Sequence, residues 1–353
     1  MNKNSFLILN ILLAIVQIGI YYISKIPPEQ FWPGAFLSFA FPYVTIFNAI
    51  FILGWLMSKR LFSLISLFSI IITLPDITSS FSLPVKQTEG KFQILSYNVK
   101  NFDLYNWSRN KDSREKMLEI IRTENPDMIC FQEFFTNEKD EFDNIKKIHE
   151  EFGYKYFHYE ESTQYQKNHW GSATFSKFPI VERGKIDFDG EFKNMSIYTD
   201  VKIQNEVLRI YNLHLQSYHM IDEDYDFLKA ISDFKIPESG SLISIFRKMR
   251  SGFVKRSKQA AIIKSHIDEY EGKKIVCGDF NDIPISYTYK LISKDMKDSY
   301  RFRGLGMGKT FVSSLPSLRI DYILVDNSIE VEEYRKLPYR YSDHYPISIS
   351  FSF

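Results

Sequence analysis

Short apolar runs that begin or end at polar side chains are the feature of this sequence that most restricts its fold. Beyond residue 90, runs of this kind end at Asn98, Glu133, His214 and Asp279. Two further runs begin at polar side chains, which are Asp321 and the pair Asp343-His344. If these groups share one site, strands that end with them cannot run parallel to strands that begin with them. The sequence therefore predicts mixed or largely antiparallel sheets and disfavours a doubly wound parallel sheet.

Segments with helical periodicity separate these runs, which is typical of an α/β domain. Residues 113–123 and 255–270 both repeat apolar side chains at helical spacing. Residues 76–90 contain proline and glycine among serines and threonines, which predicts a linker. We therefore expect one domain over residues 91–353.

Composition excludes little. The net charge of +1 gives no general argument for a nucleic-acid partner. Cys130 and Cys277 lie inside apolar runs, so we expect two buried thiols rather than a disulfide framework.

The first 75 residues differ from the rest because uncharged apolar runs dominate them. We expect a membrane region over residues 1–75 with three transmembrane helices, at residues 6–24, 35–57 and 58–74. The third run is short and reaches spanning length only if the charged residues at its start extend toward water. A cleaved signal peptide would explain the first run alone. Two spans, with the third run in the interface or the soluble core, remain the alternative.

Charges beside the apolar runs predict the sidedness of the chain. Lys3 precedes the first run, and Lys59 and Arg60 separate the second from the third, whereas Lys25 is alone in the other loop. Because cationic loops favour the cytoplasm, a multi-pass protein with three spans would carry its C-terminal domain on the exoplasmic or periplasmic side. Two spans would reverse this expectation.

Oxygen-bearing side chains at two strand ends suit a hard divalent cation. Glu133 closes a buried run, where a carboxylate is costly unless it is compensated. Asn98 closes another run and adds a neutral oxygen. Oxygen ligands favour Mg²⁺ or Mn²⁺ over zinc. A surface glutamate at a strand end explains Glu133 alone equally well.

Other polar groups suit the handling of water, protons and phosphate. Asp279 and Asn281 are two apart in an extended segment, so their side chains face the same side, where they can align a water molecule. An ordinary turn explains the same residues without chemistry. His214 and His344 can stabilise a phosphate or relay a proton, and Asp321 can orient His344. Either histidine alone is more often structural.

Taken in order, these residues resemble the endonuclease/exonuclease/phosphatase superfamily, which includes apurinic endonucleases, DNase I, sphingomyelinases and inositol polyphosphate phosphatases. The motifs that carry the resemblance are Tyr97-Asn98, Gln132-Glu133, Asn212-Leu213-His214, Gly278-Asp279-Phe280-Asn281, Arg319-Ile320-Asp321-Tyr322 and Ser342-Asp343-His344. The resemblance covers residues 91–353 and implies a four-layer α-β-β-α sandwich with two packed mixed sheets.

The resemblance also implies roles for individual residues. The implied metal ligands are Glu133, Asn98 and Asp343. The implied catalytic residues are Asp279, His344, Asp321 and His214, and the implied phosphate contacts are Asn281 and again His214. In this scheme Asp279 aligns or deprotonates water, and His344 stabilises the transition state or exchanges a proton. Which of these two residues is the general base stays open.

Two features bear on the substrate. DNA-repair members of the superfamily carry an acidic residue two positions after the first asparagine, where this chain has Lys100, so a repair function is in doubt. The run at residues 212–217 looks more like the sphingomyelinase and phosphatase branches.

A long segment between His214 and Asp279 adds a further candidate. Residues 218–258 begin with acidic residues that include Asp222 and then become basic, with apolar side chains interleaved. Such a helix can lie on anionic lipid, line a groove for a phosphate backbone, or simply pack on the domain. Arg256 is the candidate phosphate contact in this segment.

The sequence as a whole predicts a membrane-anchored, Mg²⁺-dependent phosphoesterase that hydrolyses a phosphodiester. The substrate is nucleic acid, a phospholipid or sphingomyelin headgroup, or a small phosphate ester. The other expected partner is the lipid bilayer, and no protein partner is implied. A catalytically silent scaffold of the same fold is the non-enzymatic alternative, which the retention of every matched catalytic position disfavours.

Overall fold

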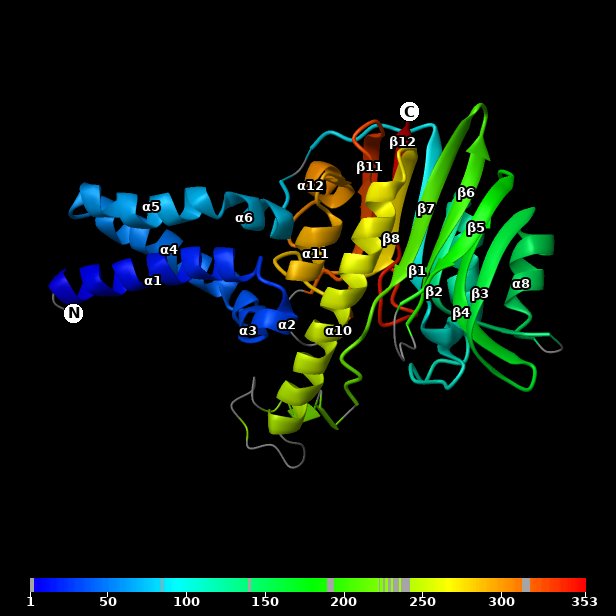
Figure 1. Cartoon of the computed structure of the whole chain (residues 1–353), viewed down its shortest axis with the longest axis horizontal. Coiled ribbons are helices and arrows are strands. Elements are labelled where there is room, and N and C mark those ends of the chain that lie inside the picture. The colour runs from blue at the N-terminus through cyan, green and yellow to red at the C-terminus, as the bar shows by residue number, and fades with distance from the viewer. Residues whose placement is uncertain are drawn as a thin grey trace.

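The computed structural model describes residues 3–83, 85–138, 141–188, 194–221, 223–224, 226–227, 230, 235, 242–312 and 318–353. Two sheets pack face to face with helices on their outer faces, and an arm of N-terminal helices extends from one side of this sandwich (Figure 1). The expected four-layer α-β-β-α arrangement is therefore confirmed.

Both sheets are mixed, as predicted. One contains, in spatial order, β11 (Glu330–Lys336), β12 (Ile347–Ser352), β1 (Phe92–Asn98), β2 (Met128–Asn137), β4 (Asn168–Ser176) and β3 (Tyr156–Tyr165). The other contains β5 (Ile180–Ile186), β6 (Ser196–Ile203), β7 (Glu206–His214), β8 (Lys273–Asp279), β10 (Asp321–Val325) and β9 (Lys297–Asp298). β1 is parallel to β2 and antiparallel to β12, while β8 is parallel to β7 and antiparallel to β10. In each sheet, the strands that end in polar groups are therefore parallel to each other and antiparallel to the strand that follows or begins with polar groups.

Alternation along the strands builds the core on both faces of each sheet. Ile94, Met128 and Ile275 are among the side chains between the sheets. Helix α7 (Ser113–Glu124) covers the first sheet, and α10 (Leu242–Glu269) with α11 (Tyr287–Ile292) covers the second. Other short helices of the domain include η2 (Lys100–Asp103), α8 (Asn144–Lys146), η3 (Lys147–Glu151) and α12 (Ser299–Arg303).

The N-terminal arm is a bundle of apolar helices. Its elements are α1 (Lys3–Ile23), α2 (Pro28–Phe31), α3 (Pro33–Ser38), α4 (Phe41–Leu56), η1 (Arg60–Phe62), α5 (Ser63–Ile72) and α6 (Leu74–Ser80). Among the described helices, α1 is long and apolar enough to cross a membrane. The segment of η1 and α5 would be a second such element if it formed one span with α6, from which a bend of 64° separates it.

Two of the three predicted spans differ from the observed helices. The apolar run at 35–57 contains a continuous helix only from Phe41, because the chain turns at Phe39 and Ala40 before α4 begins with Pro42 in its first turn. Within the run at 58–74, α5 covers only Ser63–Ile72, and Pro75 lies in the first turn of α6, which begins at Leu74. Proline lacks the amide hydrogen that a helix interior needs, so it occurs in the first turn of a new helix.

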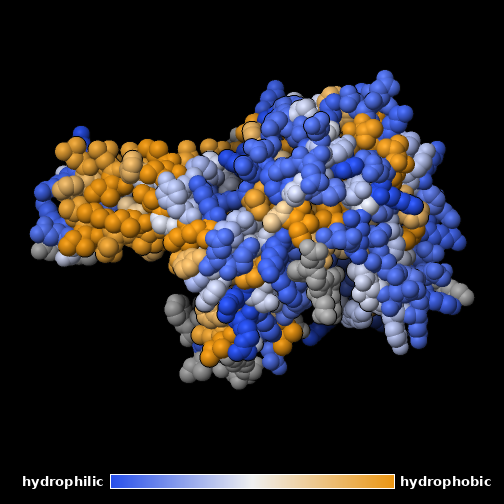
Figure 2. Space-filling view, in the orientation of Figure 1, coloured by the Kyte–Doolittle hydropathy of each residue, from blue (hydrophilic) through white to orange (hydrophobic). Residues whose placement is uncertain are grey.

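The arm has polar side chains inside and apolar side chains outside. Asn48 bonds to Gln17 at 2.8 Å and to Ser66 at 2.7 Å, and Asn10 bonds to Trp55 at 2.9 Å. All of these residues are buried. The outer surface is apolar (Figure 2) and includes Ile8, Leu12, Ile15, Ile46, Ile50, Leu53, Leu64, Phe68 and Ile71.

The arm packs directly on the domain. Lys290 of α11 forms an ion pair of 2.7 Å with Asp76 of α6. Ile20 and Phe41 form a small apolar core with Ile283, which follows β8 in sequence. The predicted linker at 76–90 also differs from expectation. Its first residues belong to α6, and Ser82 pairs with Gly306 as a β-bridge, while Pro84 lies outside the described residues.

Candidate active site

Strand register brings the predicted site residues to one edge of the sandwich. In the second sheet, Asp279 lies directly between His214 of β7 and Asp321 of β10. In the first sheet, Asn98 at the end of β1 lies opposite Gln132 of β2. Because the two sheets pack face to face, the side chains from both sheets meet at this edge.

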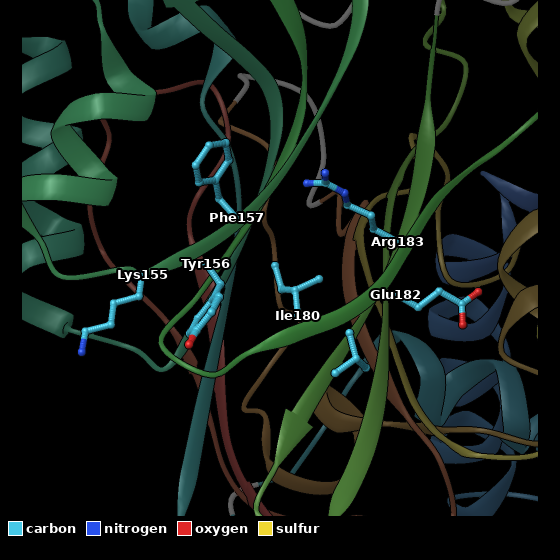
Figure 3. Close-up of a pocket in the computed structure, with 7 residues that line it drawn as sticks. Lys155, Tyr156, Phe157, Ile180, Glu182 and Arg183 are labelled. Carbon is cyan, nitrogen blue, oxygen red and sulfur yellow. The ribbon is translucent and has the colours of Figure 1, made fainter.

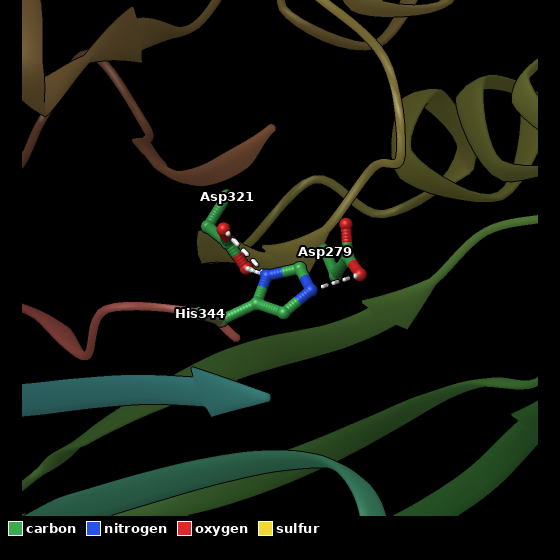
Figure 4. A group of neighbouring side chains, drawn as sticks. All are labelled: Asp279, Asp321 and His344. Carbon is green, nitrogen blue, oxygen red and sulfur yellow. Dashed lines mark hydrogen bonds and ion pairs between the residues drawn. The ribbon is translucent and has the colours of Figure 1, made fainter. Parts of the chain in front are cut away.

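His344 lies between two carboxylates (Figure 4). Its Nδ1 is 2.9 Å from Oδ2 of Asp321, and its Nε2 is 3.7 Å from Oδ2 of Asp279. All three side chains are buried. The imidazole is therefore oriented by Asp321 and presents its other nitrogen toward Asp279, an arrangement suited to moving a proton.

Burial and charge shift the titration of this group. Burial raises the pKa of Asp279 to about 7, the Asp321 carboxylate adds to the rise, and His344 opposes it. Burial alone would lower the pKa of His344, but the Asp321 and Asp279 carboxylates outweigh it and raise the pKa well above its ordinary value. An aspartate that titrates near neutral pH beside a protonated histidine can serve as a base with its partner acid.

Glu133 projects into the site from an irregularity in β2. The register between β2 and β4 shifts between Phe131 and Phe134, and Glu133 adopts a left-handed φ of 49°. Such bulges redirect side chains, and a non-glycine residue in this region is strained. Asn98 Nδ2 donates to Glu133 Oε1 at 3.1 Å and to Asp279 Oδ2 at 3.1 Å. Asn98 thus links the candidate metal ligand to the candidate base.

His214 also contacts Glu133 and Asp279. Its Nε2 is 3.5 Å from Glu133 Oε1 and 4.0 Å from Asp279 Oδ2. Burial lowers the pKa of His214. Asn194 Nδ2, which lies 3.3 Å from Nε2 of His214, is a site neighbour that the sequence did not indicate. Asn194 precedes β6 without a recognisable motif, so nothing local marks it.

The segment after β8 holds Asn281 against the same edge. Asn281 has a left-handed φ of 53°, and its Nδ2 donates to Leu215 O at 2.9 Å and to Asp279 Oδ2 at 3.2 Å. Gly278 has a φ of 131°, and a Cβ there would lie 2.0 Å from Leu213 O. Only glycine allows this close approach of β7 and β8.

Asp343 contacts a cation of the chain itself. Lys100 Nζ lies 2.7 Å from Asp343 Oδ2, and Asp343 Oδ1 is 4.0 Å from His344 Nε2. Burial would raise the pKa of Asp343, but the His344 and Lys100 charges outweigh it and lower the pKa. The lysine that replaces the acidic residue of the repair enzymes therefore neutralises one of the predicted metal ligands.

Two groups of side chains in the described residues offer oxygen ligands. Ligand atoms of Asp279, Asp321 and His344 lie within 4.8 Å of one another. Both nitrogens of His344 already face carboxylates in this group, which suits proton transfer better than ligation. The second group contains Glu133, whose Oε1 accepts from the Asn98 amide at 3.1 Å. The Glu133 side chain is 33% exposed, and a carboxylate that an ion can reach in this way suits a Mg²⁺-type cation.

Arg256 is the predicted site residue that the structure does not bring to this edge. Its guanidinium is fully buried, 3.1 Å from Asp282 Oδ2 and 2.7 Å from the carbonyl of Gln216. With no exposed surface it cannot reach a substrate phosphate in this conformation, so the predicted contact is not supported. It instead fastens α10 to the segments that follow His214 and Asn281.

A pair of buried polar side chains lies behind the site. Gln132 Nε2 donates to Asn212 Oδ1 at 2.7 Å, and Asn212 Nδ2 donates to Ala173 O at 3.0 Å. These bonds join the two sheets directly beneath Glu133 and His214. Polar groups inside an otherwise apolar interface fix its register because unpaired alternatives are costly.

A hollow of about 410 Å³ lies between the edge strands β3 and β5, away from these residues (Figure 3). Its lining residues are Lys155, Tyr156, Phe157, Ile180, Val181, Glu182 and Arg183. None of them belongs to the site described above, so this hollow is not part of it.

Comparison with solved structures shows the fold shared by the domain. An endonuclease/exonuclease/phosphatase family protein from Leptotrichia buccalis is 18% identical to this chain, with a TM-score of 0.52. The match covers 74% of this chain and 100% of that chain. The human nocturnin catalytic domain, solved with a bound sulfate anion, is 17% identical, with a TM-score of 0.53. The match covers 75% of this chain and 94% of that domain. A mannosyl-6-phosphatase from Bacteroides thetaiotaomicron is 18% identical, with a TM-score of 0.50. The match covers 74% of this chain and 100% of that protein.

Family models match both parts of the chain, whereas no curated protein matches it. A domain of unknown function matches residues 3–80, which form the arm. The model described as the endonuclease/exonuclease/phosphatase family matches residues 95–344, which include every strand-end group of the site. The chain therefore belongs to the endonuclease/exonuclease/phosphatase family and is a hydrolase that acts on phosphoester bonds.

Proposed function

We propose that this protein is a metal-dependent phosphoesterase, anchored in a membrane by its arm, that hydrolyses a phosphodiester by attack of water. The observation that carries the proposal is the position of His344 between Asp321 and Asp279, while His214 lies within 4.0 Å of both Asp279 and Glu133. Phosphoester hydrolysis requires a group that transfers a proton and a charge that stabilises the phosphate in the transition state. His344 with its two carboxylates suits the first task, and a cation held by Glu133 would suit the second.

The chain's own residues divide the work as follows. Asp279, with a pKa of about 7, accepts the proton of the attacking water. The carboxylate partners of His344 raise its pKa, so its imidazolium donates a proton to the oxygen of the leaving alcohol. His214 and Asn281 hold the phosphate oxygens from the side of β7 and β8.

Glu133, Asn98 and Asp343 would hold a Mg²⁺ ion, with Mn²⁺ as a substitute. When bound there, the ion supplies neutralising charge for the phosphate and for the transition state. Lys100 already offsets part of the charge of Asp343, so Glu133 is the principal ligand in this proposal.

The arm suits a bilayer because its polar groups face inward and its apolar groups outward. α1, α4 and α5 traverse the arm in alternating directions, and we propose that they form a multi-pass anchor despite the short lengths of α4 and α5. The N-terminus lies at the end of the arm away from the domain (Figure 1), as does the loop with Lys59 and Arg60, since α5 leads from it to α6 on the domain. The cationic end is cytoplasmic by preference, so the domain is exoplasmic.

Sidedness is tested with Lys86→Cys, an exposed position beyond the arm, since both native cysteines are buried. Labelling by an impermeant maleimide in intact cells is expected. Labelling only after lysis would place the domain in the cytoplasm.

Activity is tested on the purified full chain in detergent, with and without Mg²⁺. The substrates are plasmid DNA, sphingomyelin, inositol phosphates and the soluble diester bis(4-nitrophenyl) phosphate. Asp279→Asn removes the base without changing side-chain size, and we expect turnover to fall about 10²–10⁴-fold with the melting temperature preserved. Undiminished turnover by the variant would overturn the proposed mechanism.

A further inference from the structure

Exposed aromatic residues mark the end of the arm nearest to the domain. Tyr22 near the end of α1 is 57% exposed, Tyr43 in the first turn of α4 is 51% exposed, and Trp32 between α2 and α3 is 37% exposed. Tyrosine and tryptophan concentrate where a membrane meets water. These three residues therefore place the membrane surface at the level where the arm joins the domain.

The N-terminal half of α10 lies at this same level. The ring of Phe246 is 4.9 Å from the ring of Phe36 in α3, and the guanidinium of Arg250 is 5.2 Å from the ring of Trp32. Figure 2 shows apolar surface on this part of the domain next to the arm. The helix thus continues the level that the aromatic residues mark.

One face of this half-helix combines exposed apolar and cationic side chains. Ile243 is 71% exposed and Phe246 is 49% exposed, while Arg247 and Arg250 are also exposed. Positions 243, 246, 247 and 250 share one side of a helix because 3.6 residues make a turn. Apolar side chains with arginines beside them are typical of helices that lie in a lipid headgroup layer. We call these four residues the α10 docking face.

The rest of α10 ties this face to the active site. Arg256 pairs with Asp282 at 3.1 Å and donates to the Gln216 carbonyl at 2.7 Å. Gln259 Oε1 accepts from the Gln216 amide at 2.9 Å. Gln216 and Asp282 closely follow His214 and Asn281, so a single helix connects the docking face to both loops that hold the phosphate.

We propose that the α10 docking face binds the lipid headgroup layer and holds the active site against the bilayer, so that the substrate is the phosphate ester of a membrane lipid. This inference rests on the proposed phosphoesterase function. Lipid is favoured over a protein partner because the α10 docking face contacts the arm at the level of its exposed tyrosine and tryptophan side chains, where we place the membrane surface. The two arginines favour anionic lipid, and each cation near such a surface strengthens binding roughly fivefold.

The docking is tested without any activity measurement. The full chain is reconstituted in phosphatidylcholine vesicles, with or without phosphatidylglycerol, that contain lipid spin-labelled near the headgroup. Ile243→Cys carries an environment-sensitive fluorophore, and the matched control is Ala261→Cys, an exposed position on the same helix face about five turns further on. We expect lipid quenching at position 243, enhanced by phosphatidylglycerol, and none at position 261. Absence of lipid quenching at position 243 overturns the docking.

The substrate class is tested with the double variant Ile243→Glu/Arg247→Glu. Its hydrolysis of vesicle phospholipid or sphingomyelin is expected to be lost, while hydrolysis of soluble bis(4-nitrophenyl) phosphate stays at the unmodified level. Equal activity of both proteins on vesicle lipid, or preferential cleavage of DNA by the unmodified chain, would overturn the lipid assignment. Failure of the unmodified chain on every ester would instead refute the phosphoesterase function and leave the quenching result standing.

Discussion

Nδ1 of His344 lies 2.9 Å from Oδ2 of Asp321, although the two residues belong to different sheets. His344 precedes β12 in the first sheet, and Asp321 starts β10 in the second. The contact therefore depends on how the two sheets pack against each other. It also favours the protonated form of the imidazole that faces Asp279.

Asp321→Asn is expected to move both limbs of the pH profile of kcat/KM toward lower pH. Burial raises the pKa of Asp279 to about 7 and the Asp321 carboxylate adds to the rise, and the same carboxylate raises the pKa of His344. Its removal lowers both values, so the base is freed at lower pH and the acid is lost at lower pH. The control Asp295→Asn removes an exposed charge and should shift neither limb. An unchanged profile in Asp321→Asn would show that another pair of groups controls the rate.

Glu133→Gln is expected to abolish stabilisation by Mg²⁺. A ligand that binds only the folded state at 100 times its Kd adds about 2.7 kcal/mol to the free energy of unfolding. Differential scanning fluorimetry of the full chain should show a rise in melting temperature with Mg²⁺, absent in the variant. Glu206→Gln, which changes an exposed carboxylate paired with Lys273, should keep the rise. A full Mg²⁺ response in Glu133→Gln would place the metal elsewhere.

Gly278→Ala is expected to destabilise the fold by about 1–3 kcal/mol and to impair activity. The added methyl group would lie 2.0 Å from the Leu213 carbonyl, so β7 and β8 must separate and move Asp279. The comparison is Gly153→Ala, at a φ of 80° with no atom within 4 Å of the new Cβ, which isolates the cost of backbone strain. Denaturant unfolding and turnover measure both variants. Equal losses in the two would mean that close packing at Gly278 is unimportant.

Lys290→Met is expected to destabilise the full chain by roughly 3–5 kcal/mol, because it leaves the buried Asp76 carboxylate without its partner. The double variant Asp76→Leu/Lys290→Met removes both charges and should recover most of the loss. Thermal unfolding in detergent compares the single and double variants. If the double variant is as unstable as the single one, the loss does not come from an unpaired Asp76 carboxylate.

The sequence alone determined the directions of the strands and the convergence of their polar ends. Asn98 and Asp279 end strands, whereas Asp321 begins one, and this local order requires a mixed sheet wherever the groups meet. Register then follows from alternation, because a shift by one residue would expose the apolar face. For this reason the fold and most of the gathered residues could be read from short segments.

Only the tertiary structure decided what depends on contacts between distant segments. The register shift that turns Glu133 toward the site arises in the pairing of β2 with β4. Asn194 lies beside His214 because of how the chain returns before β6. Arg256 looked like a free cation in a basic segment, but packing buries it against Asp282. A side chain's exposure and partner are properties of the assembled layers, and neither the residue type nor its neighbours in sequence contain that information.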